Sequence, residues 1–162
     1  MTEPGWPPAP IRTERLVLRA SEARDRAGFV ELFASPEVGT YIGGPQPRDE
    51  LERTLAEVPG RRFGLFVVER EGSFIGMITL DRRELGYLFL STAWGHGYAT
   101  EACAAVLTWF AAARPGEPLT LVTQTANTPS MRLAAKLGFT EVKRFEAYGA
   151  EQWSGRWSGP TP

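Results

Sequence analysis

Two glycines separated by one residue stand in the run Trp94-Gly95-His96-Gly97-Tyr98-Ala99-Thr100. A strand is predicted before this run and a helix after it, so several backbone N–H groups and the positive end of the helix dipole point the same way. Such a turn can bind an anion such as a pyrophosphate; the alternative is a tight connection that needs glycine only for positive φ. The run is neither a dinucleotide fingerprint, which has a third glycine, nor a Walker A loop, which ends in Gly-Lys-Ser/Thr.

Five polar side chains in or near this turn and the elements beside it could take part in the chemistry or support it. Glu84 opens the strand that leads to the turn, and its alternative role is a solvated carboxylate beside two arginines. Ser130 and Asn127 lie at the start of a later helix. Their alternative roles are structural: Ser130 would fill the first turn of this helix, and Asn127 would cap it. His96 is the only histidine, but inside the turn it is expected to contribute its backbone N–H and a contact to phosphate rather than move protons. Glu101, one turn into the next helix, is expected to complement the helix dipole.

The elements that position these residues follow from apolar periodicity, caps and turn signals. Short turns between the middle strands favour antiparallel pairing, and the strand–helix–strand passage over 85–123 favours a parallel crossover. We therefore expect an α/β (α+β) fold, with a mixed, mostly antiparallel sheet of about six to seven strands and about four helices. The expected elements are strands at 15–19, 63–69, 73–80, 85–90, 119–123, 139–145 and 152–157, and helices from Ser21 to 35, from Pro47 to 58, at 99–113 and at 128–137.

Length and composition indicate one domain. The chain has 162 residues, 43% of them hydrophobic and 23% charged, which is typical of soluble globular proteins. We expect a single domain over residues 12–157, between a flexible proline-rich tail at 1–11, whose Trp6 is a candidate to pack on the domain, and a flexible tail at 158–162. No run approaches the roughly 18 apolar residues of a membrane span, and the N-terminus lacks a signal-peptide pattern.

Charge and cysteine content exclude further classes of function. The formal net charge of −1 argues against a broad nucleic-acid footprint. Cys103 is the only cysteine, which excludes an intramolecular disulfide and a cysteine-rich zinc site. We expect a cytoplasmic protein with no bound metal, no nucleic-acid partner and no membrane contact. Trp153 and Trp157 lie on one face of the last predicted strand, which suits a core position or the surface of a homodimer.

The glycine run resembles motif A of the GNAT acetyltransferases, whose loop Q/R-x-x-G-x-G/A binds the pyrophosphate of acetyl-CoA. Trp94 replaces the leading Gln/Arg, and the run is similar to the W-G-x-G-Y-A-x-E-A form of the ribosomal-protein (alanine/serine) N-acetyltransferase branch. Thr13–Arg19 resembles the opening strand of that branch, and Asn127–Phe139 resembles its N-x-x-S…K-L-G-F helix. The matches lie in order and in the expected elements, and the resemblance spans about residues 13–157.

This resemblance implies the GNAT fold, in which the sheet splays open after residues 85–90 and holds acetyl-CoA, as co-substrate, in the gap. The end of that strand pairs with the pantetheine arm, the glycine turn wraps the pyrophosphate, and the late helix contributes further contacts. The cofactor-binding residues that it implies are Phe89, Leu90, Ser91, Gly95, His96, Gly97, Tyr98, Ala99, Thr100, Asn127, Ser130 and Arg132.

The family transfers the acetyl group by direct attack of an amine, so the protein must align the amine and manage protons. Glu84 is the expected base. Ser130 is the expected proton donor to the thiolate, directly or through water, because Ala134 stands where the wider family often has a tyrosine. We expect the acceptor to be the α-amine of a protein or peptide N-terminus, with specificity set by Glu37–Arg48 and the final strands. The alternatives are acetylation of a small-molecule amine, a non-catalytic acyl-CoA-binding regulatory module, and a phosphate-binding domain that does not bind coenzyme A.

Overall fold

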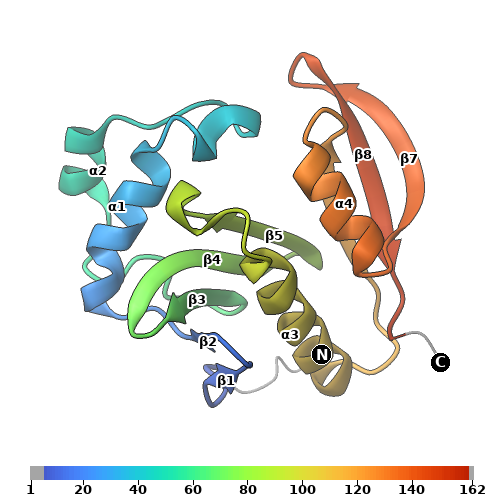
Figure 1. The fold of residues 1–162 in the computed structure, drawn as a ribbon, viewed down its shortest axis with the longest axis horizontal. Coiled ribbons are helices and arrows are strands. Elements are labelled where there is room, and N and C mark those ends of the chain that lie inside the picture. The colour runs from blue at the N-terminus through green and yellow to red at the C-terminus, as the bar shows by residue number, and fades with distance from the viewer. Residues whose placement is uncertain (1–5, 161–162) are drawn as a thin grey trace.

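The computed structural model describes residues 6–160, and these form one mixed sheet with helices on both faces (Figure 1). The sheet has eight strands in the order β1-β2-β3-β4-β5-β6-β8-β7, one more than the upper expectation, because residues 11–19 supply two short strands. The mixed sheet and the four α-helices are as predicted. The strands are β1 Ile11–Arg12, β2 Val17–Arg19, β3 Leu65–Arg70, β4 Ser73–Asp81, β5 Glu84–Phe89, β6 Leu119–Gln124, β7 Thr140–Ala147 and β8 Ala150–Trp157; the helices are α1 Arg26–Ala34, α2 Arg48–Thr54, α3 Tyr98–Ala113 and α4 Thr128–Lys136.

The sheet opens between β5 and β6, as expected. These two parallel strands pair only at Glu84 and Thr120, where the Thr120 N–H donates to the carbonyl of Arg83 at 2.8 Å. Beyond this point β6 pairs with β8 instead, over Leu119–Gln124. In Figure 1, β4 and β5 lie in the middle of the view, while α4, β8 and β7 lie to the right. The opening between β5 and β6, with its closed end at Glu84, is called the fork below.

Two apolar layers hold the helices on the sheet. On one face, Leu85 and Phe89 of β5 belong to the main core together with α3 and α4. On the other face, Phe29 of α1 packs against Leu65 and Val67 of β3. Successive side chains of β5 therefore point alternately to the α3 face and to the α1 face of the sheet.

The ends of the domain contribute to the core. The ring of Trp6 lies 5.0 Å from that of Phe66 and 6.2 Å from that of Trp109, so the predicted N-terminal tail contacts the domain at this residue. Ile11, which was also expected to lie in the tail, pairs with β2. Trp153 and Trp157 are buried in the main core. Residues 1–5 and 161–162, which complete the two predicted tails, lie outside the described residues.

Two predicted helix boundaries were wrong. Ser21 does not cap the first helix, because a short 3-10 turn over Ala23–Asp25 begins after Glu22, which forms a capping box with Asp25. The second helix ends at Thr54 rather than at residue 58, and its C-cap, Leu55, is extended.

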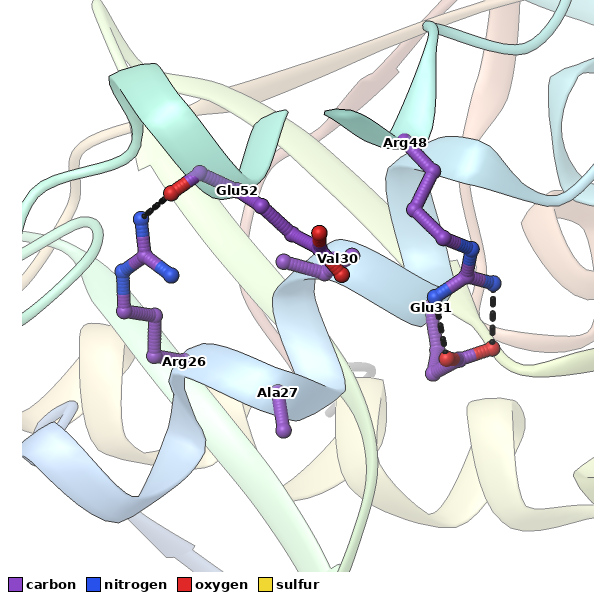
Figure 2. Close-up of a pocket in the computed structure, with 6 residues that line it drawn as sticks. All are labelled: Arg26, Ala27, Val30, Glu31, Arg48 and Glu52. Atoms are coloured by element: carbon purple, nitrogen blue, oxygen red, sulfur yellow. Dashed lines mark hydrogen bonds and ion pairs between the residues drawn. The ribbon is translucent and has the colours of Figure 1, made fainter. Parts of the chain in front are cut away.

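The end of α2 is held by a residue of α1. The guanidinium of Arg26 donates to the backbone carbonyl groups of Glu52, Leu55 and Ala56. Figure 2 shows the contact with Glu52. Carbonyls at a helix end need such partners, because they have none inside the helix. Arg26 of α1 therefore pairs with the carbonyl groups at the end of α2. This contact between two helices cannot be predicted from the local sequence of α2.

Three findings concern other sequence-based expectations. Among residues 6–160, no helix is both long enough and apolar enough to cross a bilayer. The same residues contain no group of three or more histidine, cysteine or acidic side chains placed to hold a metal ion. Cys103 is fully buried in α3, and burial raises the pKa of its thiol.

The turn between β4 and β5 offers a stability test. Arg82 and Arg83 both have positive φ, 50° and 63°, a conformation that costs a residue other than glycine about 1–2 kcal/mol. The double variant Arg82→Asn/Arg83→Gly carries residues that favour this turn. We expect it to unfold about 2–4 °C higher for each kcal/mol gained, as measured by calorimetry. An Arg82→Ala/Arg83→Ala variant removes the same charges and should show no such gain; an equal gain in both variants would contradict the explanation.

Candidate active site

The glycine turn leaves a set of amides without partners in the helix. Gly95 and Gly97 have φ of 81° and 79°, and Gly97 is the left-handed N-cap residue of α3. Among the described residues, no side chain caps this helix end. The amides of residues 98–100 therefore remain available, together with the positive end of a helix of 16 residues. This geometry suits an anion, as the sequence predicted.

Arg15, in the segment between β1 and β2, holds the glycine turn in place. Its Nη1 donates to the carbonyl of His96 at 2.9 Å, and its Nε donates to Oε1 of Glu101 at 2.7 Å. The guanidinium carbon also lies 4.5 Å from the ring centroid of Tyr98, within the range of a cation–π interaction. Burial opposes ionisation of Glu101, but hydrogen bonds from Thr13 and Arg15 outweigh it and lower the pKa of its carboxyl. Glu101 thus helps to hold the turn, in addition to its expected effect on the helix dipole.

The backbone of β5 presents alternate residues to the fork. The carbonyl of Arg83 faces β6, whereas the N–H of Leu90 faces β4 and donates to the carbonyl of Ile75 at 2.9 Å. Because the direction alternates along a strand, the backbone groups of Tyr87 and Phe89 face the fork. These groups can pair with an extended ligand as an added strand would.

Of the three strand-end residues expected to pair with the pantetheine arm, Phe89 lies in β5 with its carbonyl toward the fork, while Leu90 and Ser91 follow the strand. The carbonyl of Leu90 accepts from the N–H of Ala93 at 2.8 Å, and that of Ser91 accepts from the N–H of Trp94 at 3.1 Å. The indole Nε1 of Trp94 donates to the fork-facing carbonyl of Phe89 at 2.9 Å. Trp94 therefore reaches back over the strand, a contact that its position in the glycine turn did not predict.

Ser130 lies in the first turn of α4, is only 6% exposed, and contacts a residue that the sequence did not single out. The phenol of Tyr87 donates to Oγ of Ser130 at 2.8 Å. Burial, the largest effect, raises the pKa of Tyr87 to about 12. The only sequence signal for Tyr87 is that it precedes Phe89 by two residues and so shares its face of the strand.

The other predicted residues of α4 have different positions. Asn127 is the N-cap, where its Oδ1 accepts from the N–H of Ser130 at 3.3 Å. Asn127 therefore has the capping role that was its alternative. Arg132 is exposed on the same helix.

Glu84 stands at the closed end of the fork. It pairs with Asp81 of β4 and with Thr120 of β6, so its side chain lies on the α1 face, opposite to that of Tyr87. Glu84 is exposed at the end of the strand, but loss of hydration around its carboxylate, followed by the charge of Asp81, raises the pKa of Glu84. The two predicted catalytic residues, Glu84 and Ser130, thus face the fork from opposite sides of the sheet and are not hydrogen-bonded to each other.

The segment expected to set acceptor specificity reaches the open end of the fork. A 3-10 turn at Val38–Tyr41 brings Tyr41 to the end of β6, where its hydroxyl donates to the carbonyl of Ala126 at 3.3 Å. In return, Nε2 of Gln124 donates to the carbonyl of Tyr41 at 3.1 Å. These contacts join the segment between α1 and α2 to the end of β6 at the open end of the fork.

Two surface pockets lie outside the fork. One, of about 370 Å³, is lined by α1 and α2, and Figure 2 shows that both of its arginines have partners: Arg48 pairs with Glu31, and Arg26 donates to the backbone carbonyl of Glu52. The second, of about 450 Å³, lies at the β4–β5 turn and is lined by Arg83 and Glu117, among others. The arginine side chains that line the first pocket hold α1 and the segment of α2 together. Neither pocket contains the glycine turn or Ser130.

Comparisons with known proteins agree with this geometry. A family model described as "Acetyltransferase (GNAT) domain" matches residues 15–140. YkkB of Bacillus subtilis (strain 168), described as uncharacterized, is 32% identical over 141 residues, which cover 78% of this chain and 82% of that protein. The crystal structure of a GNAT-family acetyltransferase from Bacillus anthracis has a TM-score of 0.77 at 22% identity and covers 93% of this chain and 98% of its own. RimL, a ribosomal L7/L12 α-N-protein acetyltransferase solved with coenzyme A, has a TM-score of 0.76 at 14% identity, with coverage of 93% and 98%.

Proposed function

The chain belongs to the GNAT family of acetyltransferases, with acetyl-CoA as its donor, and from this we propose that its acceptor is the α-amine of a protein or peptide N-terminus. One observation carries the proposal. Glu84 lies at the closed end of the fork, on the face opposite to Ser130, and the pKa of its carboxyl is raised by loss of hydration and by Asp81. Glu84 in this position is a suitable general base for an amine that loses its proton easily.

The donor half of the proposed site fits the chain's own groups. The unpaired amides of residues 98–100 suit the pyrophosphate, and the fork-facing backbone of Tyr87 and Phe89 suits the amides of the pantetheine arm. When bound, acetyl-CoA supplies an activated thioester. Arg15 and Glu101 hold the turn in shape, so little order has to be gained on binding.

The acidity of the amine distinguishes the acceptor classes. At pH 7.5, deprotonating a lysine side chain with a pKa near 10.4 costs about 4 kcal/mol, whereas an α-amine near 7.8 costs below about 0.5 kcal/mol. Little free energy is therefore needed to make an α-amine neutral, and the main task of Glu84 is to accept the proton that the nitrogen loses as it attacks. The likeness of the fold to RimL, an α-N-protein acetyltransferase, supports the same choice.

Each proposed catalytic residue then has one task. Glu84 accepts the proton that the attacking amine loses, and it returns this proton to water. Ser130 donates to the sulfur that leaves, directly or through water. The backbone along β5 and the turn before α3 align the donor with the amine, which removes much of the entropic cost of the reaction.

The experiment that tests the acceptor class is a coenzyme A release screen. We expect peptides with a free N-terminus to be consumed and to gain one acetyl group by mass spectrometry. The same peptides with a blocked N-terminus and an internal lysine should not react. Turnover of polyamines or aminoglycosides alone would favour the small-molecule alternative, and binding of acetyl-CoA without release of coenzyme A across the screen would favour a non-catalytic module.

The role of Ser130 has its own test. We expect Ser130→Ala to lower kcat by roughly 10²-fold, because the thiolate loses its donor, and to change the Kd for acetyl-CoA by no more than about twofold. Steady-state kinetics with a peptide acceptor and titration calorimetry measure the two effects. A variant with wild-type kcat would remove Ser130 from the mechanism.

A further inference from the structure

A side-chain hydrogen bond crosses the fork where β5 and β6 have separated. It joins Oη of Tyr87, on β5, to Oγ of Ser130, on α4, at 2.8 Å. Tyr87 packs against the main core on the α3 face of the sheet, and Ser130 is buried. The two groups thus meet on the side of the sheet where α3 and the donor-binding turn lie.

The direction of this bond follows from acidity. A phenol, with an ordinary pKa near 10, is a better hydrogen donor than an aliphatic hydroxyl. Burial raises the pKa of Tyr87 to about 12, so the phenol keeps its hydrogen throughout the neutral range. Tyr87 is therefore the donor, and Oγ of Ser130 is the acceptor.

The hydrogen on Oγ of Ser130 is then left over. The backbone N–H of Ser130 donates to Asn127, but among residues 6–160 nothing accepts the hydroxyl hydrogen. Buried hydrogen donors are nearly always paired. The Ser130 hydroxyl is therefore held in place by the hydrogen bond from Tyr87, and its own hydrogen is available to a ligand bound in the fork.

We propose that Tyr87 is a positioning residue, which holds the Ser130 hydroxyl so that its hydrogen points at the sulfur of coenzyme A. The inference rests on the proposed function, in which Ser130 is the donor to the leaving sulfur. As the C–S bond breaks, its electron pair stays on sulfur, and the Ser130 hydroxyl stabilises the thiolate by a hydrogen bond. The thiolate takes its proton from water, to which Glu84 returns the proton of the amine. Full transfer from Ser130 is not required, because a thiol has a pKa near 8.5.

The first test is a double-mutant cycle. We expect Tyr87→Phe, which keeps the ring, to lower kcat about tenfold with the KM for acetyl-CoA unchanged within about twofold. In the Ser130→Ala background the same change should have no further effect, because Tyr87 acts through Ser130. A kcat for Tyr87→Phe within twofold of wild type would overturn the proposal, and so would losses that multiply in the double variant.

The second test does not depend on activity. The thiolate absorbance of bound coenzyme A, titrated against pH, reports how strongly the site stabilises the anion. At a pH below the midpoint of the titration, we expect the fraction of bound coenzyme A that is present as thiolate to be about tenfold higher in wild type than in Tyr87→Phe or Ser130→Ala. Equal titrations in all three proteins would overturn the proposal.

A matched control separates loss of this hydroxyl from loss of any tyrosine hydroxyl. Tyr148 is 99% exposed at the β7–β8 turn, and Tyr148→Phe should leave both measurements unchanged. Thermal unfolding of each variant checks that it is folded. If wild type releases no coenzyme A with any amine, the proposed function fails, while the thiolate titration still decides the role of Tyr87.

Discussion

A Gly97→Val variant is expected to lose at least about 100-fold in affinity for coenzyme A, equivalent to ~2.7 kcal/mol, and to remain folded. Gly97 has φ of 79° as the N-cap residue of α3, a conformation that a β-branched residue adopts only with strain. A Cβ at this position would also lie 3.5 Å from Nη2 of Arg15, so the valine side chain disturbs the arginine that holds the proposed pyrophosphate-binding turn in shape. Titration calorimetry with coenzyme A measures the loss, and circular dichroism checks the fold. Affinity within a few fold of wild type would contradict a pyrophosphate site at this turn.

The strain itself needs a control, because valine at positive φ destabilises any turn. Gly149, at the β7–β8 turn, has φ of 76°, and no atom lies within 4 Å of a Cβ placed there. Gly149→Val should therefore lower thermal stability about as much as Gly97→Val and leave coenzyme A binding intact. If both variants lost affinity equally, the effect of Gly97→Val would be one of stability alone.

The local parts of this fold could be predicted from the sequence. The turn at Glu71-Gly72, with φ of 51° and 81°, follows from glycine between two β-rich runs. The glycine turn at 94–100 could be found because two glycines with positive φ lie within three residues. The parallel crossover from β5 to β6 follows from the helix between them. Each of these features depends on neighbours in the chain.

The contacts that complete the candidate site could not be predicted in this way. Arg15 reaches Glu101 across 86 positions, and Tyr87 reaches Ser130 across 43 positions. Such pairs are brought together by the order of the strands, which the apolar pattern indicates only in outline. The end of α2 was missed for the same reason, because its carbonyls find their partner in Arg26 of another helix. Sequence patterns thus located the backbone of the site but not the side chains that hold it.

The base assignment leads to the second large effect. We expect Glu84→Gln to lower kcat/KM for a peptide acceptor by roughly 10³-fold near neutral pH, because glutamine keeps the shape but accepts no proton. The loss should shrink as pH rises through the α-amine pKa near 7.8, since above it the acceptor is already neutral. Rate profiles against pH, with Glu71→Gln at the distant β3–β4 turn as control, measure this. Parallel profiles for wild type and Glu84→Gln would rule out Glu84 as the base.

A change at Asp81 tests the same assignment without touching the carboxylate. Loss of hydration and the charge of Asp81 both raise the pKa of Glu84, so Asp81→Asn should lower it and move the acid limb of the wild-type profile to lower pH. Glu84→Gln/Asp81→Asn should show no such movement. An acid limb that stays in place in Asp81→Asn would mean that another group limits the rate.

Stability gives an independent measure of the raised pKa. Because folded Glu84 holds its proton more tightly than the unfolded chain does, the folded state binds more protons between the ordinary value of 4.5 and the raised one. The contribution of Glu84 to the free energy of unfolding is therefore full at lower pH and is lost as pH rises through this interval. In denaturant unfolding at several pH values, the stability of wild type relative to Glu84→Gln should fall as pH rises through this interval. If the two proteins showed the same pH dependence, Glu84 would have an ordinary pKa, and its place at the closed end of the fork would be no reason to regard it as a base.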